Sequence, residues 1–236
     1  MSPIFKARVA LGCRARSLVG AGLFLAEETL AQTRYVLVVR VPRPVEVRIE
    51  DVYLSLASTT RPAMGFHITL LGPYFFSAGA SPRFMSKVSA MCRSWTPFST
   101  RLCGLGAFKE KDDNAVYLQI VEPQILLALH NALLEATAGM TIPQDERYRE
   151  WYVLSYQPHV TLGLGLSDRE LEEFLRSSTL RQFDESFEVS RIWLAEQVPH
   201  GPWQYVAEYP LGAPSSGEMD RAIPVWRRPS MEDSGD

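Results

Sequence analysis

Two copies of the pattern His-x-Thr contain the residues best suited to chemistry. They are His67-Ile68-Thr69-Leu70 and His159-Val160-Thr161-Leu162, and together they use two of the chain's four histidines. Residues two apart on a β-strand point to the same side of a sheet. Each histidine would therefore share a face with its threonine, while Ile68 and Val160 enter the core. The repetition predicts a single site built from two strands.

The chemistry that suits this quartet is attack on a phosphodiester. A histidine has an ordinary pKa of about 6.5, so near neutrality one imidazole can accept a proton while another donates one. Either His67 or His159 can take either role. The hydroxyls of Thr69 and Thr161 would donate hydrogen bonds to the non-bridging phosphate oxygens, where negative charge accumulates. This scheme uses neither a metal nor an organic cofactor.

A metal centre is the rival use of paired histidines, and the spacing disfavours it. Neither copy carries an acidic residue at ligand spacing, and the sequence has no HExxH or HxH pattern. A single His-x-Thr is more often an incidental polar face, but two copies in matching contexts reverse that judgement. We expect His130 to lie on the face of a helix and His200 to be a solvated turn residue.

The spacing of apolar residues predicts strands and helices in alternation. We expect strands at 35–39, 66–71, 102–108, 115–121 and around Val160, and a closing hairpin of 187–194 with 205–211. Helices are expected from Ser81 to Trp95, from Pro123 to Ala136, and from Ser167 onward, where Glu170 would complete a capping box. Residues 46–57 are ambiguous between helix and strand.

The two motifs divide the chain into similar halves, at about 34–105 and 106–212. Each is expected to be α+β, and we interpret them as related by a pseudo-twofold axis. Residues 1–33 form an N-terminal extension that resembles a weak organelle-targeting or secretory leader, although we favour a disordered start. Residues 213–236 are expected to form a mobile tail.

Composition limits the partners and the compartment. The net charge is −3, which argues against gripping extended double-stranded nucleic acid by a basic face. No apolar run approaches the roughly 20 residues that a membrane helix needs. The three cysteines show no CxxC spacing, so a reducing, cytoplasmic location is expected, with Cys92 and Cys103 as small core residues.

The motifs and their flanks resemble the two-histidine (2H) phosphoesterase superfamily, and within it the bacterial 2′-5′ RNA ligases and RNA cyclic phosphodiesterases. The resemblance spans about 35–211 and is supported by 104–108, 116–134 and 205–211. It implies a bilobal fold whose antiparallel sheets line a central cleft, with helices outside. It also implies catalytic roles for His67, Thr69, His159 and Thr161.

We therefore expect a metal-independent phosphodiesterase acting on 2′,3′-cyclic phosphates or on 2′-5′-linked nucleotide or short RNA ends. A 2′-5′ RNA ligase is the alternative, because ligation reverses the same transfer. A non-catalytic phosphate- or RNA-binding module is a third class, disfavoured because all four motif residues are present. Tyr74 and Tyr156 lie near the motifs and could stack on a base, a contact of about 1–3 kcal/mol, although core packing is the commoner use of such residues.

Overall fold

The computed structural model describes residues 32–54, 62, 64–109, 113–144, 155–176 and 182–212. Residues 33–236 form one compact unit, distinct from residues 1–32. The expected N-terminal extension, apart from Gln32 and Thr33, and the expected tail at 213–236 lie outside the described residues. None of the helices within the described ranges has the length and apolar character that a membrane crossing requires.

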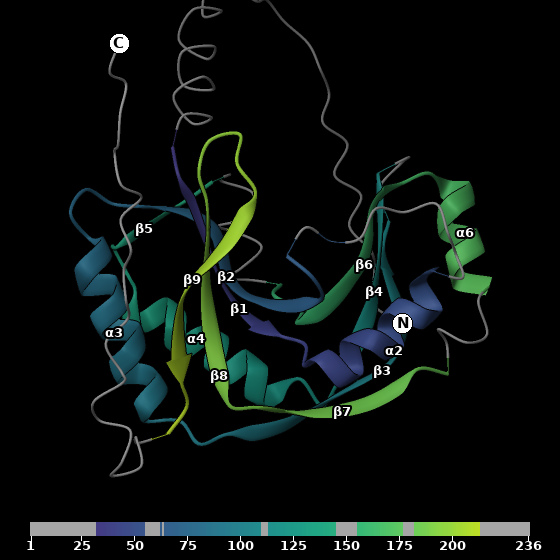
Figure 1. The fold of residues 1–236 in the computed structure, drawn as a ribbon, viewed down its shortest axis with the longest axis horizontal. Helices are drawn as coiled ribbons and strands as arrows, with labels where there is room; N and C mark the ends of the chain where they lie inside the picture. The colour runs from purple at the N-terminus through teal and green to yellow at the C-terminus, as the bar shows by residue number, and fades with distance from the viewer. Residues whose placement is uncertain are drawn as a thin grey trace, which may run out of the picture. The chain divides into compact units, whose positions relative to one another are not determined.

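The described strands form a single curled antiparallel sheet (Figure 1). Its order is β7 (Asp184–Val189), β3 (Phe98–Phe108), β4 (Asn114–Val121), β6 (His159–Leu166), β2 (His67–Phe76), β1 (Arg34–Arg40), β8 (Arg191–Gln197) and β9 (Trp203–Pro210). The short strand β5 (Thr141–Pro143) pairs with β2 off this path.

The sheet order is symmetric about the contact between β6 and β2. On one side lie β2, β1, β8 and β9, here called the β2 arm; on the other lie β6, β4, β3 and β7, the β6 arm. The expected α+β fold with two lobes is confirmed, but both lobes belong to one sheet. A division near residue 105 falls inside β3, and β8 and β9 return to the β2 arm, so neither arm is one continuous stretch of chain.

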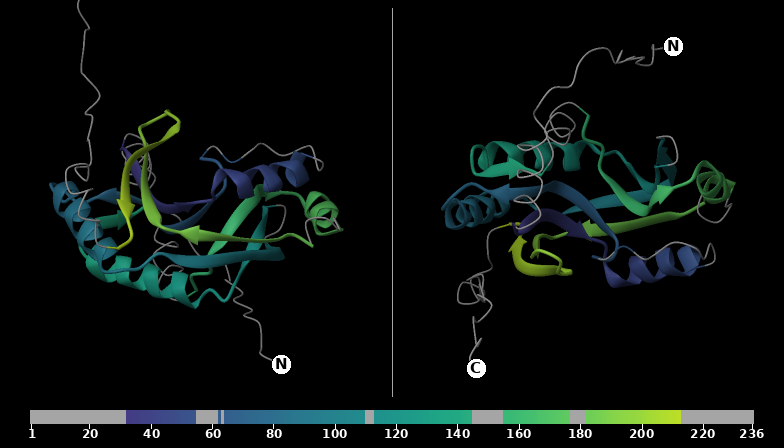
Figure 2. Two further views of the ribbon diagram at one scale, coloured as in Figure 1. Left: turned by 60° about the horizontal axis from the view of Figure 1, so that its bottom comes forward. Right: turned by 90° about the horizontal axis from the view of Figure 1, so that it is seen from above.

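Within the described ranges, four helices flank the sheet. On the β2 arm, α4 (Gln124–Ala136) contacts β2, and α3 (Ser81–Arg93) contacts α4 and β9. On the β6 arm, α6 (Asp168–Arg176) contacts β4 and β6, and α2 (Arg43–Leu54) contacts β7. Figure 2 shows α2 and α4 on opposite sides of the sheet. The large buried cluster holds Ile68 and Val160 together with the apolar stripe of α4, including Leu126, Leu129 and Leu133.

Several local expectations hold and others need correction. The capping box of α6 is present: Ser167 N–H donates to Glu170 Oε2 at 2.8 Å, and Glu170 N–H donates to Ser167 Oγ at 3.3 Å. Helix α3 instead begins at Ser81, after Ala80 and without a side-chain cap. The ambiguous stretch at 46–57 falls largely in α2.

Two strand boundaries also differ from expectation. Strand β2 does not stop at Gly72, whose φ of 112° is open to glycine and lets the strand bend and continue. The closing hairpin is β8 with β9, whereas β7 pairs with β3. The change of pairing partner occurs at Ser190, between the two strands, and so inside the stretch from 187 to 194 that is expected to be one strand.

Candidate active site

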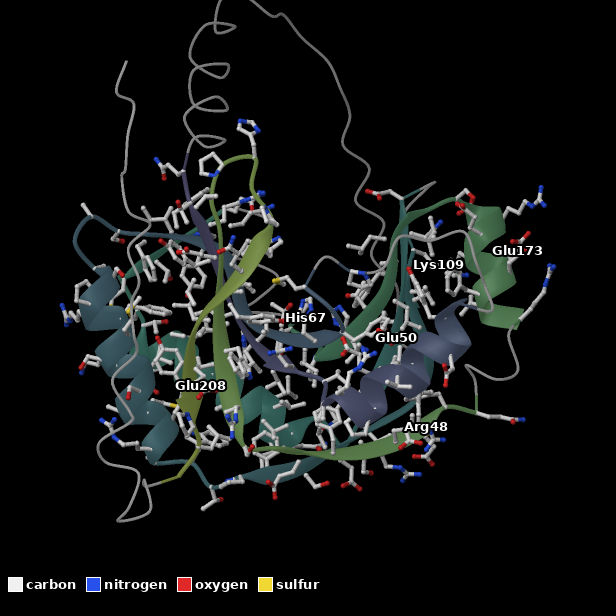
Figure 3. The ribbon with its side chains drawn as sticks, viewed as in Figure 1. Arg48, Glu50, His67, Lys109, Glu173 and Glu208 are labelled. Carbon is white, nitrogen blue, oxygen red and sulfur yellow. The ribbon has the colours of Figure 1, made fainter. Side chains whose placement is uncertain are left out.

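The two His-x-Thr segments meet at the centre of the sheet. Strands β2 and β6 pair antiparallel with Ile68 opposite Val160. Antiparallel neighbours run in reverse order, so His67 lies across from Thr161 and Thr69 across from His159. Residues directly opposite are about 4.5–5.5 Å apart and share a face. The structure thus brings the four predicted residues together on one face, and Figure 3 shows His67 between the two arms.

The opposite face anchors this quartet. Ile68 and Val160 are completely buried, and so are Leu70 and Leu162. A slip of one residue in either strand would bury a histidine and expose an apolar side chain. The hydrophobic core therefore fixes the register that gathers the polar quartet.

The two histidine rings are held in the same way. His67 Nδ1 lies 2.9 Å from the carbonyl oxygen of Gly65, and His159 Nδ1 lies 2.7 Å from that of Gln157. A carbonyl only accepts, so in each neutral ring Nδ1 carries the hydrogen and donates. The bond leaves Nε2 of each ring as the nitrogen that can accept or deliver a proton.

The surroundings lower the pKa of both histidines. For His67 the main cause is partial burial; the Gly65 carbonyl opposes it, and the charge of His159 adds to the lowering. For His159 burial again lowers the pKa, against the Gln157 carbonyl. The influence of one imidazole on the other disfavours the doubly protonated pair. A state with one proton on the pair is what paired acid and base catalysis needs.

Aromatic rings surround His159. The ring of Phe108 lies 5.2 Å from it edge-on, and the ring of Tyr117 lies 4.9 Å away, centroid to centroid. Tyr117 covers Gly106, where a Cβ atom would come within 2.4 Å of the tyrosine ring. Its hydroxyl accepts a hydrogen bond from Gln157 Nε2 at 3.0 Å. The sequence offered one signal for these rings, the small residues within 104–107. They lie on β3 opposite β4, the strand that pairs with the second motif.

A histidine and a tyrosine support β2 near Thr69. The hydroxyl of Tyr156 donates to the Thr69 carbonyl at 2.6 Å, and His130 Nδ1 donates to the Leu70 carbonyl at 2.6 Å. The two rings stack at 3.8 Å. His130 lies on a face of helix α4 as expected, and this face is buried: the residue is 1% exposed. The ring of Tyr156 stacks on His130 and its hydroxyl binds the Thr69 carbonyl, and these contacts disfavour a role in stacking on a base.

Tyr74 is not placed to bind a substrate. Its side chain is 2% exposed and packs among Tyr35, Phe76 and Phe84 in the main core. Its hydroxyl has no hydrogen-bond partner among the described residues. The expectation of base stacking at Tyr74 is therefore wrong, because β2 continues past Gly72 and carries Tyr74 into the core.

The other expected residues are placed as follows. His200 is exposed in the turn between β8 and β9, and Cys92 is buried, whereas Cys103 is only half-buried. Within the described ranges no group of three or more histidine, cysteine or acidic side chains is arranged to hold a metal ion.

Comparison with known proteins places these features in a family. The sequence model of the 2′-5′ RNA ligase superfamily matches residues 41–200. A predicted phosphoesterase of Halalkalibacterium halodurans is 25% identical over 146 residues, which cover 62% of this chain and 79% of that protein. A predicted phosphoesterase of Bacillus pumilus is 25% identical over 150 residues, with 62% and 79% covered.

Solved structures share the fold. The crystal structure of E. coli LigT complexed with 3′-AMP superposes with a TM-score of 0.57 at 18% identity, covering 77% of this chain and 99% of LigT. That of TT0787 of Thermus thermophilus has a TM-score of 0.55 at 19% identity, covering 77% and 100%. LigT has also been crystallised with ATP and with NADP+.

Proposed function

Because this chain belongs to the 2′-5′ RNA ligase superfamily of two-histidine phosphoesterases, we propose that it is a metal-independent phosphodiesterase acting on 2′,3′-cyclic phosphates or 2′-5′ linkages at nucleotide or RNA ends. The observation that carries this proposal is the register of Ile68 opposite Val160. That register sets two histidines and two threonines around one point on the surface. An in-line displacement at phosphorus requires a base beside the attacking oxygen and an acid beside the leaving oxygen.

The roles follow from the free nitrogens of the rings. With the phosphate over β2 and β6, the neutral imidazole takes a proton from water through Nε2 as the water oxygen bonds to phosphorus. The protonated imidazole gives its proton to the ribose oxygen as the bond from that oxygen to phosphorus breaks. Thr69 and Thr161 donate to the non-bridging oxygens, which gain charge at the five-coordinate stage.

A nucleotide substrate is supported by two observations. LigT, which shares the fold, has been crystallised with 3′-AMP, ATP and NADP+. In this chain, Phe108 and Tyr117 line the side of the site next to His159 and offer an apolar surface beside the reacting group. Ligation at a 2′-5′ linkage is the second candidate, favoured by the family's description, because the same groups catalyse the transfer in both directions.

The test is incubation with the four nucleoside 2′,3′-cyclic phosphates in EDTA, with phosphorus NMR of the products. We expect opening of the ring, and a loss of about 100- to 10,000-fold in kcat for His67→Ala or His159→Ala. His200→Asn is the matched control: it removes an exposed histidine at φ 60°, a conformation that asparagine tolerates. Binding without product in the wild type would refute the proposal and favour a non-catalytic module.

A further inference from the structure

Arg40 lies beside the catalytic face, one strand away from His67. In the pairing of β1 with β2, Arg40 is directly opposite His67, and Val38 is opposite Thr69. Opposed residues share a face, so Arg40 projects from the same side of the sheet as the catalytic quartet. Arg40 is exposed at the end of β1, on the side of His67 that faces away from His159.

Two aromatic rings hold the Arg40 side chain. Its guanidinium carbon lies 5.0 Å from the centroid of Trp193 and 4.5 Å from that of Tyr205. The Tyr205 ring is itself fixed, because its hydroxyl donates to the Met64 carbonyl at 2.8 Å. Stacking on rings orients a guanidinium while its N–H groups, which lie in its plane, remain available.

Arg40 forms no ion pair with any described residue, in contrast to its basic neighbours. Arg43 binds Glu46 and Glu50 at 3.1 and 3.0 Å, and Arg191 binds Glu208 at 3.1 Å. Glu46, whose charge acts on the pKa of Tyr205 in opposition to that of Arg40, is the acid paired with Arg43. Of these three arginines, Arg40 is the one that has no ion pair with a described residue.

A surface pocket adjoins this arginine. It has a volume of about 270 Å³ and lies where β1 ends, α2 begins and β7 leads into β8. Its lining includes Arg40, Arg43, Arg191 and Trp193, together with the acidic residue Glu188. Arg43 and Arg191 are already paired with glutamates, so the Arg40 guanidinium and the Trp193 indole are the lining groups that fit a phosphorylated ligand.

We propose that Arg40 binds a second phosphate, the one carried on the 5′-oxygen of the nucleoside whose 2′,3′-cyclic phosphate is opened. The proposal rests on the proposed function and deepens it. Strands are spaced about 4.8 Å apart, so the backbone of Arg40 lies roughly 5–10 Å along the sheet from the scissile phosphate. Its long side chain lies against rings of β8 and β9, and we expect it to meet the far end of one nucleoside. The substrate would then be the end of an RNA chain. A second arginine is placed in a similar way on this face: the guanidinium carbon of Arg34 lies 6.0 Å from the ring centroid of Trp203.

Three substrates test this inference: a nucleoside 2′,3′-cyclic phosphate, the same compound with a 5′-phosphate, and a dinucleotide ending in the cyclic phosphate. We expect wild-type kcat/KM to be about 10-fold or more higher for the two that carry the second phosphate, as a charge-assisted hydrogen bond provides. Arg40→Ala should abolish this preference and leave the plain nucleoside substrate unchanged. A preference only for the free 5′-phosphate would identify a mononucleotide as the ligand.

Controls separate a binding contact from a structural role. Arg83→Ala removes the same charge from the exposed surface of α3 and should keep the preference. For the dinucleotide, Arg40→Ala should flatten the plot of log(kcat/KM) against log salt by about 0.7, the value of one lost phosphate contact on a single strand. Equal loss on all three substrates, or no preference in the wild type, would overturn the role of Arg40. If no substrate turns over, the proposed function falls, and this subsite with it.

Discussion

The hydroxyl of Tyr156 gives a direct test of how the catalytic strand is supported. Tyr156→Phe deletes one oxygen and keeps the ring that stacks on His130. The deleted group donates to the Thr69 carbonyl at 2.6 Å, so the change leaves the backbone carbonyl of the proposed catalytic threonine without this donor. If Tyr156 is a supporting residue, the variant should lose stability; if it only stacks on a substrate base, phenylalanine should replace it without cost.

The size of the loss follows from the geometry. A neutral hydrogen bond of this kind contributes about 0.5–1.5 kcal/mol, because water competes for both partners in the unfolded chain. We therefore expect the free energy of unfolding to fall by about 1 kcal/mol. For a domain of this size that corresponds to a fall of about 2–4 °C in Tm.

Tyr74→Phe is the matched control. It deletes the same oxygen from a tyrosine that is equally close to the motif in sequence, but this hydroxyl is buried and has no partner among the described residues. An unpaired buried hydroxyl costs stability, so its removal should be neutral or stabilising by up to about 1 kcal/mol. The two variants should shift stability by different amounts or in opposite directions.

The assay is urea unfolding followed by tryptophan fluorescence, with the slope of the transition compared among the wild type and both variants. Activity on a nucleoside cyclic phosphate should fall with little change in KM for Tyr156→Phe, since no substrate contact is removed. A Tyr156→Phe variant as stable as Tyr74→Phe, or one with KM raised and stability intact, would refute the supporting role.

Three further outcomes are expected. The kcat/KM profile should be bell-shaped with an optimum below about pH 6.5, because both histidine pKa values are lowered. The base loses activity when it is protonated below its pKa, and the acid loses activity when it is deprotonated above its own pKa. An optimum above neutrality would contradict this. Gly106→Ala should lower both activity and stability, by about 1–3 kcal/mol for the latter, because a Cβ would come 2.4 Å from the Tyr117 ring next to His159; a wild-type melting curve would contradict it. Dialysis against EDTA should leave turnover of a cyclic phosphate unchanged, and recovery on added zinc or magnesium would show a metal requirement.

The sequence was most informative where a local period was repeated. The alternation in His67-Ile68-Thr69 placed His67 and Thr69 on one face, and the second copy predicted a meeting of two strands. The capping box at Ser167 and Glu170 and the stripe of α4 were likewise readable, because they depend on residues three or four apart.

What the sequence did not reveal depends on strand pairing over long distances. Arg40 becomes part of the catalytic surroundings only because β1 pairs with β2, and Tyr117 only because β4 pairs with β6. The contact of His130 with β2 was not readable because its partner, the Leu70 carbonyl, is 60 residues away. The path of the chain between the arms was hidden for the same reason: the chain passes at Ser190 from a strand paired with β3 to a strand paired with β1 and β9.

Because of the pairing of Ile68 with Val160, turnover should report whether β2 and β6 are paired in the correct register. Side chains on a strand change sides at every residue, so a molecule whose two arms join one step out of alignment would carry one imidazole inward and would be inert. Molecules with β2 and β6 paired out of register would then contribute nothing to the measured rate. Active-site titration compared with total folded protein would count the correctly joined fraction directly.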